Sequence, residues 1–167
     1  MIINLFTRTF NNELVIQDFI DFYKSRVENI RINIHDMKST DKTVKIAKEN
    51  GCNVRNYLDF FNSKDNWKNG CWKNIPTDTV VICDINEFID LSPTIFYNCS
   101  IIKTKGYDIT DLKTLSEDTR NTNFDKLCIF DPHVIKDMHY EGSGCNPQGF
   151  IRIGEKQPNL YHLIKLK

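Results

Sequence analysis

The sequence predicts an α/β protein that combines a parallel sheet in its first half with a mixed sheet in its second half. Strand-like and helix-like segments alternate up to Cys83, an order that favours parallel strands joined by right-handed crossovers. The run Thr79–Cys83 is β-prone and bounded by turn formers, which is typical of a strand buried on both faces. Beyond it, short strand-like runs alternate with loops, and this change predicts the mixed second half.

Each element of the first half has a local signal. Asn12 suits the N-cap of the first helix, because its side-chain oxygen can accept a hydrogen bond from a free backbone N–H. Ser39 or Thr40 is expected to cap the second helix, and Gly51 to end it. The expected strands are Ile2–Phe6, Arg31–Ile34, Cys52–Val54 and Thr79–Cys83, and the expected helices are Glu13–Arg26, a segment from Ser39 or Thr40 to Lys48, and part of Tyr57–Trp72.

The second half is expected to contain shorter elements. Its strand-like runs are Thr94–Tyr97, Ser100–Thr104, Lys126–Phe130, Val134–Tyr140 and Tyr161–Leu166. A helix or a loop excursion is expected at Asp111–Asp125. No linker rich in Pro, Gly or Ser divides the two halves, so we expect one domain over residues 1–167.

Composition excludes several classes of protein. Lys plus Arg and Asp plus Glu both number 22, so the basic excess of a nucleic-acid binder is missing. No apolar run approaches the length of a membrane span, and no signal peptide is recognisable. The six cysteines form no C-x-x-C pair, and several lie inside apolar runs. A reducing, cytoplasmic setting is therefore expected, with free thiols that act as small apolar groups.

Polar residues gather directly after the expected fourth strand. Asp84, Asn86 and Glu87 follow it at the position where ligands bind in open α/β sheets, outside the carboxyl ends of the strands. The turn after the first strand contains no glycine, so neither a dinucleotide-binding fingerprint nor a P-loop is present there. A nucleoside diphosphate would then need a divalent cation and basic side chains, and carboxylate oxygens are the ligands that Mg²⁺ and Mn²⁺ prefer.

Four segments along the chain match known sequence patterns. The segment Ile34–Thr43 is similar to a strand ending in D-x-x-S-x-D-x-T, and Asp84–Phe88 to D-x-D-E-F. Lys126–Pro132 resembles a K-x-x-I-F-x-P segment, and Gly142–Pro147 a G-S-x-H-N-P loop. In this order along the chain, the motifs resemble those of glycosyltransferase family 2, whose members have the GT-A fold. Small transferases encoded by large DNA viruses are the most similar members, and for such a protein the setting is the host cytoplasm.

The resemblance implies transfer of a sugar from a nucleoside-diphosphate sugar, UDP- or GDP-linked, to a hydroxyl of a glycan or protein acceptor, with inversion. Mn²⁺ or Mg²⁺ is the implied cofactor. Glu87 would be a catalytic residue beside the donor sugar, and an acidic residue of the second half would deprotonate the acceptor. The implied nucleotide-binding residues are Thr7, Arg8, Asp36, Asp84 and Lys126, the metal ligands Asp84, Asn86 and Cys145, and the candidate bases Glu117, Asp118 and Asp125.

Two departures from the family pattern leave alternatives open. Asn86 replaces a carboxylate, and Cys145 replaces a histidine, so the metal site is weak or lost. A degenerate, non-catalytic domain that binds a nucleotide sugar or a partner protein is one alternative. A cysteine-dependent hydrolase, in which His139 activates Cys145, is a more remote one.

Purely structural roles also compete with the functional ones. Asp84–Glu87 would serve as a turn with a helix N-cap, and Lys126 as a solvated lysine. Asp41 and Thr43 are expected in the first turn of a helix, where acidic side chains are favourable. Packing is the expected role of Trp67 and Trp72, and a structural role is expected for His35, His133 and His162.

Overall fold

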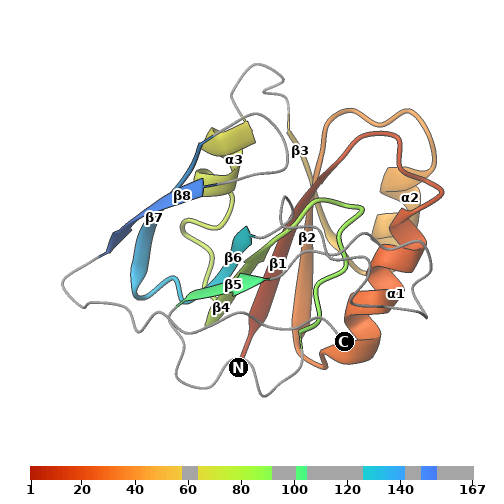
Figure 1. The fold of residues 1–167 in the computed structure, drawn as a ribbon. Coiled ribbons are helices and arrows are strands. Elements are labelled where there is room, and N and C mark those ends of the chain that lie inside the picture. The colour runs from red at the N-terminus through yellow and green to blue at the C-terminus, as the bar shows by residue number, and fades with distance from the viewer. Residues whose placement is uncertain (58–63, 92–100, 105–125, 142–147, 154–167) are drawn as a thin grey trace, which may run out of the picture.

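The computed structural model of the chain describes residues 1–57, 64–91, 101–104, 126–141 and 148–153 (Figure 1). Its main element is a six-stranded sheet with the order β3-β2-β1-β4-β6-β5. The strands are β1 (Ile3–Thr9), β2 (Ile30–Asp36), β3 (Asn53–Asn56), β4 (Thr79–Ile82), β5 (Ile101–Thr104) and β6 (Lys126–Phe130).

The strand directions confirm the predicted division of the sheet. β2 and β4 flank β1 in parallel, and β3 is parallel to β2. β6 is antiparallel to β4, and β5 is antiparallel to β6. The first four strands therefore form the expected parallel half, and the later strands make the sheet mixed.

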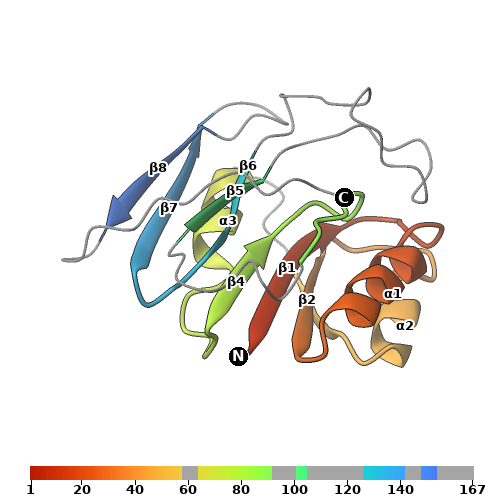
Figure 2. The ribbon, with the colours of Figure 1, turned by 60° about the horizontal axis from the view of Figure 1, so that its bottom comes forward.

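Helices cover both faces of this sheet (Figures 1 and 2). α1 (Ile16–Arg26) and α2 (Thr43–Glu49) lie on one face, and α3 (Lys64–Gly70) lies on the other. Beside α3, β7 (Ile135–Glu141) and β8 (Gln148–Ile153) form an antiparallel hairpin. β8 was not predicted from the sequence, whereas β6 has the predicted bounds.

Alternating strand residues build a separate core on each face, because successive side chains of a strand point to opposite sides. Leu5 and Val81 pack with the buried face of α1 in the first core. Phe6 and Val80, one residue away, pack with Trp67 of α3 in the second core. All four residues of β4 are buried, as the apolar run Thr79–Cys83 predicted.

The helix starts differ from the predictions. α1 begins at Ile16 after a turn in which Asn12 accepts through its backbone carbonyl, and its side chain donates to Thr9, so it is not the N-cap. α2 begins at Thr43 with Lys42 at its N-cap, so neither Ser39 nor Thr40 caps it. The chain before it forms a turn in which the backbone N–H groups of Ser39 and Thr43 donate to the carboxylates of Asp36 and Asp41. Gly51 has φ +69° just past the end of α2, as expected for a C′ glycine.

Some predicted elements lie outside the described residues, namely Thr94–Tyr97, Asp111–Asp125 and Tyr161–Leu166. Within the described part of the chain, no helix is long and apolar enough to cross a membrane. Four cysteines there, Cys52, Cys71, Cys83 and Cys128, are buried and free, as expected for small apolar side chains.

Candidate functional site

The carboxyl ends of β1, β2 and β4 meet at one edge of the main sheet. β2 and β4 lie on opposite sides of β1, so this edge contains the topological switch point, outside which open α/β sheets bind ligands. The backbone N–H of Cys83 donates to the carbonyl of Phe6 at 3.2 Å and aligns the ends of β4 and β1. Arg8, Asp36 and Asp84 therefore belong to the same edge, which is the candidate site.

Two other predicted nucleotide residues also map to this edge. Because β6 runs antiparallel to β4, Lys126 at its start lies on the side of the sheet where β4 ends. Thr7 is completely buried, and its hydroxyl donates to the carbonyl of Arg8 at 3.4 Å. We infer that Thr7 shapes the end of β1 from within the core.

Asp36 is buried at the end of β2 and forms hydrogen bonds with the turn that follows. Its side chain is 3% exposed, and both carboxylate oxygens accept from the backbone N–H of Ser39, at 3.2 and 3.1 Å. Asp36 therefore also contributes to the fold, because its carboxylate closes the turn after β2. A carboxylate has about four acceptor positions, so acceptor capacity remains for N–H or O–H donors of a ligand.

Asp84–Glu87 forms a closed turn, and the described residues that directly follow it, 88–91, form no helix. Asp84 donates its backbone N–H to Oε2 of Glu87 at 2.8 Å, and Glu87 donates its own to the carbonyl of Asp84 at 2.9 Å. The alternative of a turn with a helix N-cap is thus correct for the turn and wrong for the helix. Asn86 is exposed at its tip.

Tyr23 of α1 fixes the chain that leaves this turn, a role that sequence reasoning missed. Its hydroxyl donates to the carbonyl of Glu87 and accepts from the backbone N–H of Ile89, both at 2.9 Å. Burial raises the pKa of Tyr23 well above its usual value, and the nearby Cys83 thiol adds to the rise. The phenol therefore stays protonated, as the hydrogen bond that it donates to the Glu87 carbonyl requires.

The described residues do not by themselves fit a divalent cation. Asp84 and Glu87 offer carboxylates, but one oxygen of Glu87 already closes the turn, and Asn86 brings no charge. Among the residues that the structure describes, no group of three or more His, Cys, Asp or Glu side chains is arranged to hold a metal ion. The third expected ligand, Cys145, lies outside the described residues, as do Glu117, Asp118 and Asp125.

Arg8 and His35 meet Trp67 on the α3 face of this edge. The guanidinium carbon of Arg8 lies 5.2 Å from the centroid of the Trp67 ring, within cation–π range. The indole N–H of Trp67 donates to Nδ1 of His35 at 2.9 Å. The predicted packing role of Trp67 is correct, since it is 2% exposed, and it also orients two residues of the candidate site.

His35 is neutral at physiological pH. Burial lowers its pKa to about 4, and the positive charge of Arg55 contributes. Because Nδ1 accepts from Trp67, the ring proton is on Nε2. Nε2 is buried and has no hydrogen-bond partner in the structure's described part.

This burial predicts a pH dependence of stability. The unfolded chain binds the His35 proton with the ordinary pKa of 6.5, above the folded value of about 4. The contribution of His35 to the free energy of unfolding should therefore have its full value above pH 6.5 and decrease as the pH drops toward 4. Urea unfolding between pH 4 and 7 should show a smaller fall in His35→Asn than in the wild type, and equal falls would contradict this.

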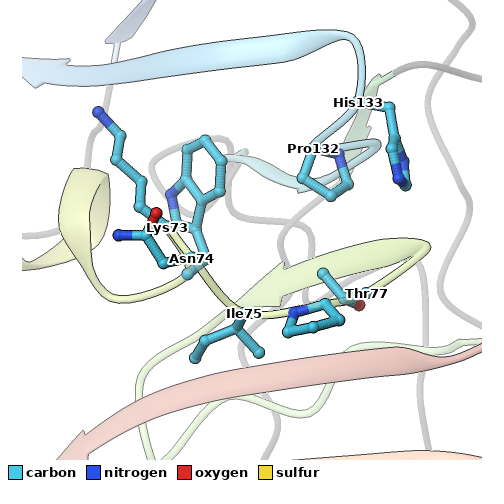
Figure 3. A pocket seen from close by; sticks show the side chains of 8 residues that line it. Lys73, Asn74, Ile75, Thr77, Pro132 and His133 are labelled. Carbon is cyan, nitrogen blue, oxygen red and sulfur yellow. The ribbon is translucent and has the colours of Figure 1, made fainter.

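A cavity of about 550 Å³ lies at the opposite edge of the sheet, where β4 begins and β6 ends (Figure 3). Figure 3 shows Lys73 and Asn74 on one side of it and Pro132 and His133 on the other. Trp72, which also lines it, is 5% exposed and packs edge-on against Phe130, as a core side chain does. The residues implied in nucleotide binding do not line this cavity.

The mixed α/β sheet with its parallel first half matches the fold of GT-A glycosyltransferase structures. The chain is similar to S. aureus TarS, with a TM-score of 0.62 and 12% identity over 84% of this chain and 30% of TarS. TarS 1–349 in complex with UDP-GlcNAc gives a TM-score of 0.52 and 17% identity over 70% and 37% of the two chains. At such low identities the likeness shows the fold alone.

The chain spans 30% of TarS and 37% of TarS 1–349 in the complex with UDP-GlcNAc, and thus less than half of either chain. No protein-family model matches its sequence, and no curated protein matches it significantly. These TarS structures are bacterial, and the expected affinity to viral transferases gains no support from them.

Proposed function

We propose that this chain binds a nucleoside-diphosphate sugar at the carboxyl edge of β1, β2 and β4 and transfers the sugar to a hydroxyl of a glycan or protein. The observation that carries the proposal is the meeting of Arg8, Asp36 and Asp84 at the switch point of a GT-A-type fold. It is supported by TarS, which has the same fold and has been solved with UDP and with UDP-GlcNAc. UDP- and GDP-linked sugars are the proposed donors.

The described residues have complementary chemistry for such a donor. Asp36 accepts from N–H or O–H donors of the nucleoside, and Asp84 lies nearer the sugar-bearing end. In the proposed inverting step, the acceptor oxygen forms a bond to the anomeric carbon while the bond to the diphosphate breaks. The nucleoside diphosphate leaves with that electron pair, and a carboxylate base takes the acceptor proton. Glu117, Asp118 and Asp125 remain the proposed bases.

A divalent cation, when bound, would neutralise the diphosphate. The proposed ligands are Asp84, Asn86 and Cys145, and their affinity should be low because Asn86 carries no charge. Asn86→Asp should therefore tighten Mn²⁺ binding several-fold in a titration, and it should leave the melting temperature unchanged because the side chain is exposed. Unchanged Mn²⁺ affinity in this variant would remove position 86 from the proposed metal site.

A non-catalytic nucleotide-sugar binder is the second candidate. It is favoured by Asn86 in place of a carboxylate and by the use of Glu87 Oε2 in closing the turn. Binding without turnover distinguishes it from a transferase. For the cysteine-hydrolase alternative, no described residue adds support, since Cys145 and its neighbours lie outside the described residues.

Release of the nucleoside diphosphate tests the proposed function. UDP- and GDP-sugars are incubated with the protein, with and without Mn²⁺, and free UDP or GDP is measured. Asp84→Asn serves as the site variant, and Asn74→Asp, at the distant cavity, as its matched control. We expect release by the wild type and the control and strong loss in Asp84→Asn. Donor binding without release would instead establish the non-catalytic binder, and equal release by all three proteins would refute the site.

A further inference from the structure

Three basic residues form a row across the carboxyl edge of the sheet. Arg8, His35 and Arg55 are the penultimate residues of β1, β2 and β3. Arg8 pairs with His35, and His35 pairs with Arg55, in the register of the parallel strands. Paired residues of neighbouring strands point to the same face. Trp67 of α3 contacts both Arg8 and His35, so the three side chains share the face that α3 covers.

The row combines two accessible cations with one unpaired donor between them. Arg55 is exposed and Arg8 is half-buried above Trp67. His35 is only 8% exposed, and its Nε2–H has no partner among the described residues. A buried donor without a partner is destabilising, so its retention between two guanidinium groups indicates a ligand acceptor.

The chemistry of the row selects an oxyanion. Guanidinium groups bind phosphoryl and carboxylate oxygens through paired N–H donors, and an uncharged imidazole N–H adds one more donor. Each of these groups donates, and none accepts from a ligand. The acceptor Asp36 is the next residue of β2 and points to the other face, so a nucleotide's hydroxyl and N–H groups are separated from its phosphoryl groups.

We propose that Arg8, His35 and Arg55 bind a phosphoryl group. We further propose that this group is the diphosphate of the donor, and this second claim rests on the proposed function. Nε2 of His35 is buried, so a phosphoryl oxygen reaches it only when a covering side chain moves. Tyr57 is half-buried with its ring centroid 6.0 Å from that of His35, and it is the side chain that we expect to turn aside.

Calorimetric titration with inorganic pyrophosphate tests the row without a nucleoside. Arg55→Gln removes one cation. His35→Asn keeps an acceptor for the Trp67 indole but loses the Nε2 donor, whereas His35→Gln keeps a donor near Nε2. We expect pyrophosphate affinity to fall about tenfold or more in Arg55→Gln and His35→Asn and to be retained in His35→Gln. Arg31→Gln, an exposed position at the other end of β2, is the control and should bind like the wild type.

The same proteins are titrated with UDP and GDP, and with uridine and guanosine, which lack phosphate. Melting temperatures confirm that each variant is folded. Wild-type affinity for pyrophosphate in both Arg55→Gln and His35→Asn, or no binding by the wild type, would overturn the row as a phosphoryl site. If pyrophosphate responds as expected while no nucleotide binds, the row stands and the proposed function fails. If UDP or GDP binds equally to all variants, the nucleotide site stands and the row is refuted.

Discussion

Asp36→Asn should lower the affinity for the nucleoside diphosphate by about ten- to a hundredfold, the loss expected for hydrogen bonds to a charged group. The carboxamide keeps an oxygen that can accept from the N–H of Ser39, so the turn after β2 should persist. The melting temperature should therefore change little. Calorimetry with UDP and GDP measures the affinity, and a thermal melt measures the stability.

Asp36→Ala provides the contrast. It removes the acceptor as well as the charge. The backbone N–H of Ser39 then loses its hydrogen-bond partner, the carboxylate of Asp36, which is only 3% exposed. It should destabilise the fold by about 1–3 kcal/mol in addition to weakening nucleotide binding. If Asp36→Asn binds nucleotide like the wild type while Asp36→Ala only lowers stability, Asp36 is a structural residue and the proposed nucleoside contact is wrong.

Trp67→Ala should cause the largest loss of stability, about 3–5 kcal/mol, as expected for truncation of a large buried aromatic side chain. Trp67 is 2% exposed and belongs to the core between the sheet and α3. The loss is a large part of the free energy of unfolding of an ordinary domain, which is about 5–15 kcal/mol. Urea unfolding of the two proteins measures the difference.

Trp67→Phe separates packing from hydrogen bonding. It keeps an aromatic ring in the core but removes the N–H that donates to His35 at 2.9 Å. We expect a smaller loss of stability, together with a weaker stacking surface for Arg8. If Trp67→Ala unfolds at the same urea concentration as the wild type, the packing of α3 against the sheet described here is incorrect.

The parallel half was predictable because its signals are local. The apolar run at Thr79–Cys83 and the glycine at position 51 each determine one element through nearby residues. The helix starts were misplaced because capping depends on contacts between loops. Asp41, for example, accepts from the backbone N–H groups of both Thr43 and Glu13, so it closes a turn between two loops as well as preceding α2.

The composition of the site was only partly predictable for the same reason. Asp84 stood out because it directly follows an apolar strand-like run in the sequence, whereas Arg8 and Asp36 were implied by the resemblance to glycosyltransferase family 2. The alignment of His35 with Arg8 and Arg55 follows from strand register, which relates segments far apart in the chain. The hydrogen bonds of the Tyr23 hydroxyl with Glu87 and Ile89 depend on how α1 packs against the end of β4, and no local sequence pattern predicts them.

A crystal structure of the chain with UDP or GDP tests the location of the nucleotide site most directly. We predict that the nucleoside lies against Asp36, outside the carboxyl ends of β1 and β2, and that the diphosphate contacts the row of Arg8, His35 and Arg55. Nucleotide bound instead in the cavity between Lys73 and His133, or anywhere away from the ends of β1, β2 and β4, would contradict the proposed site.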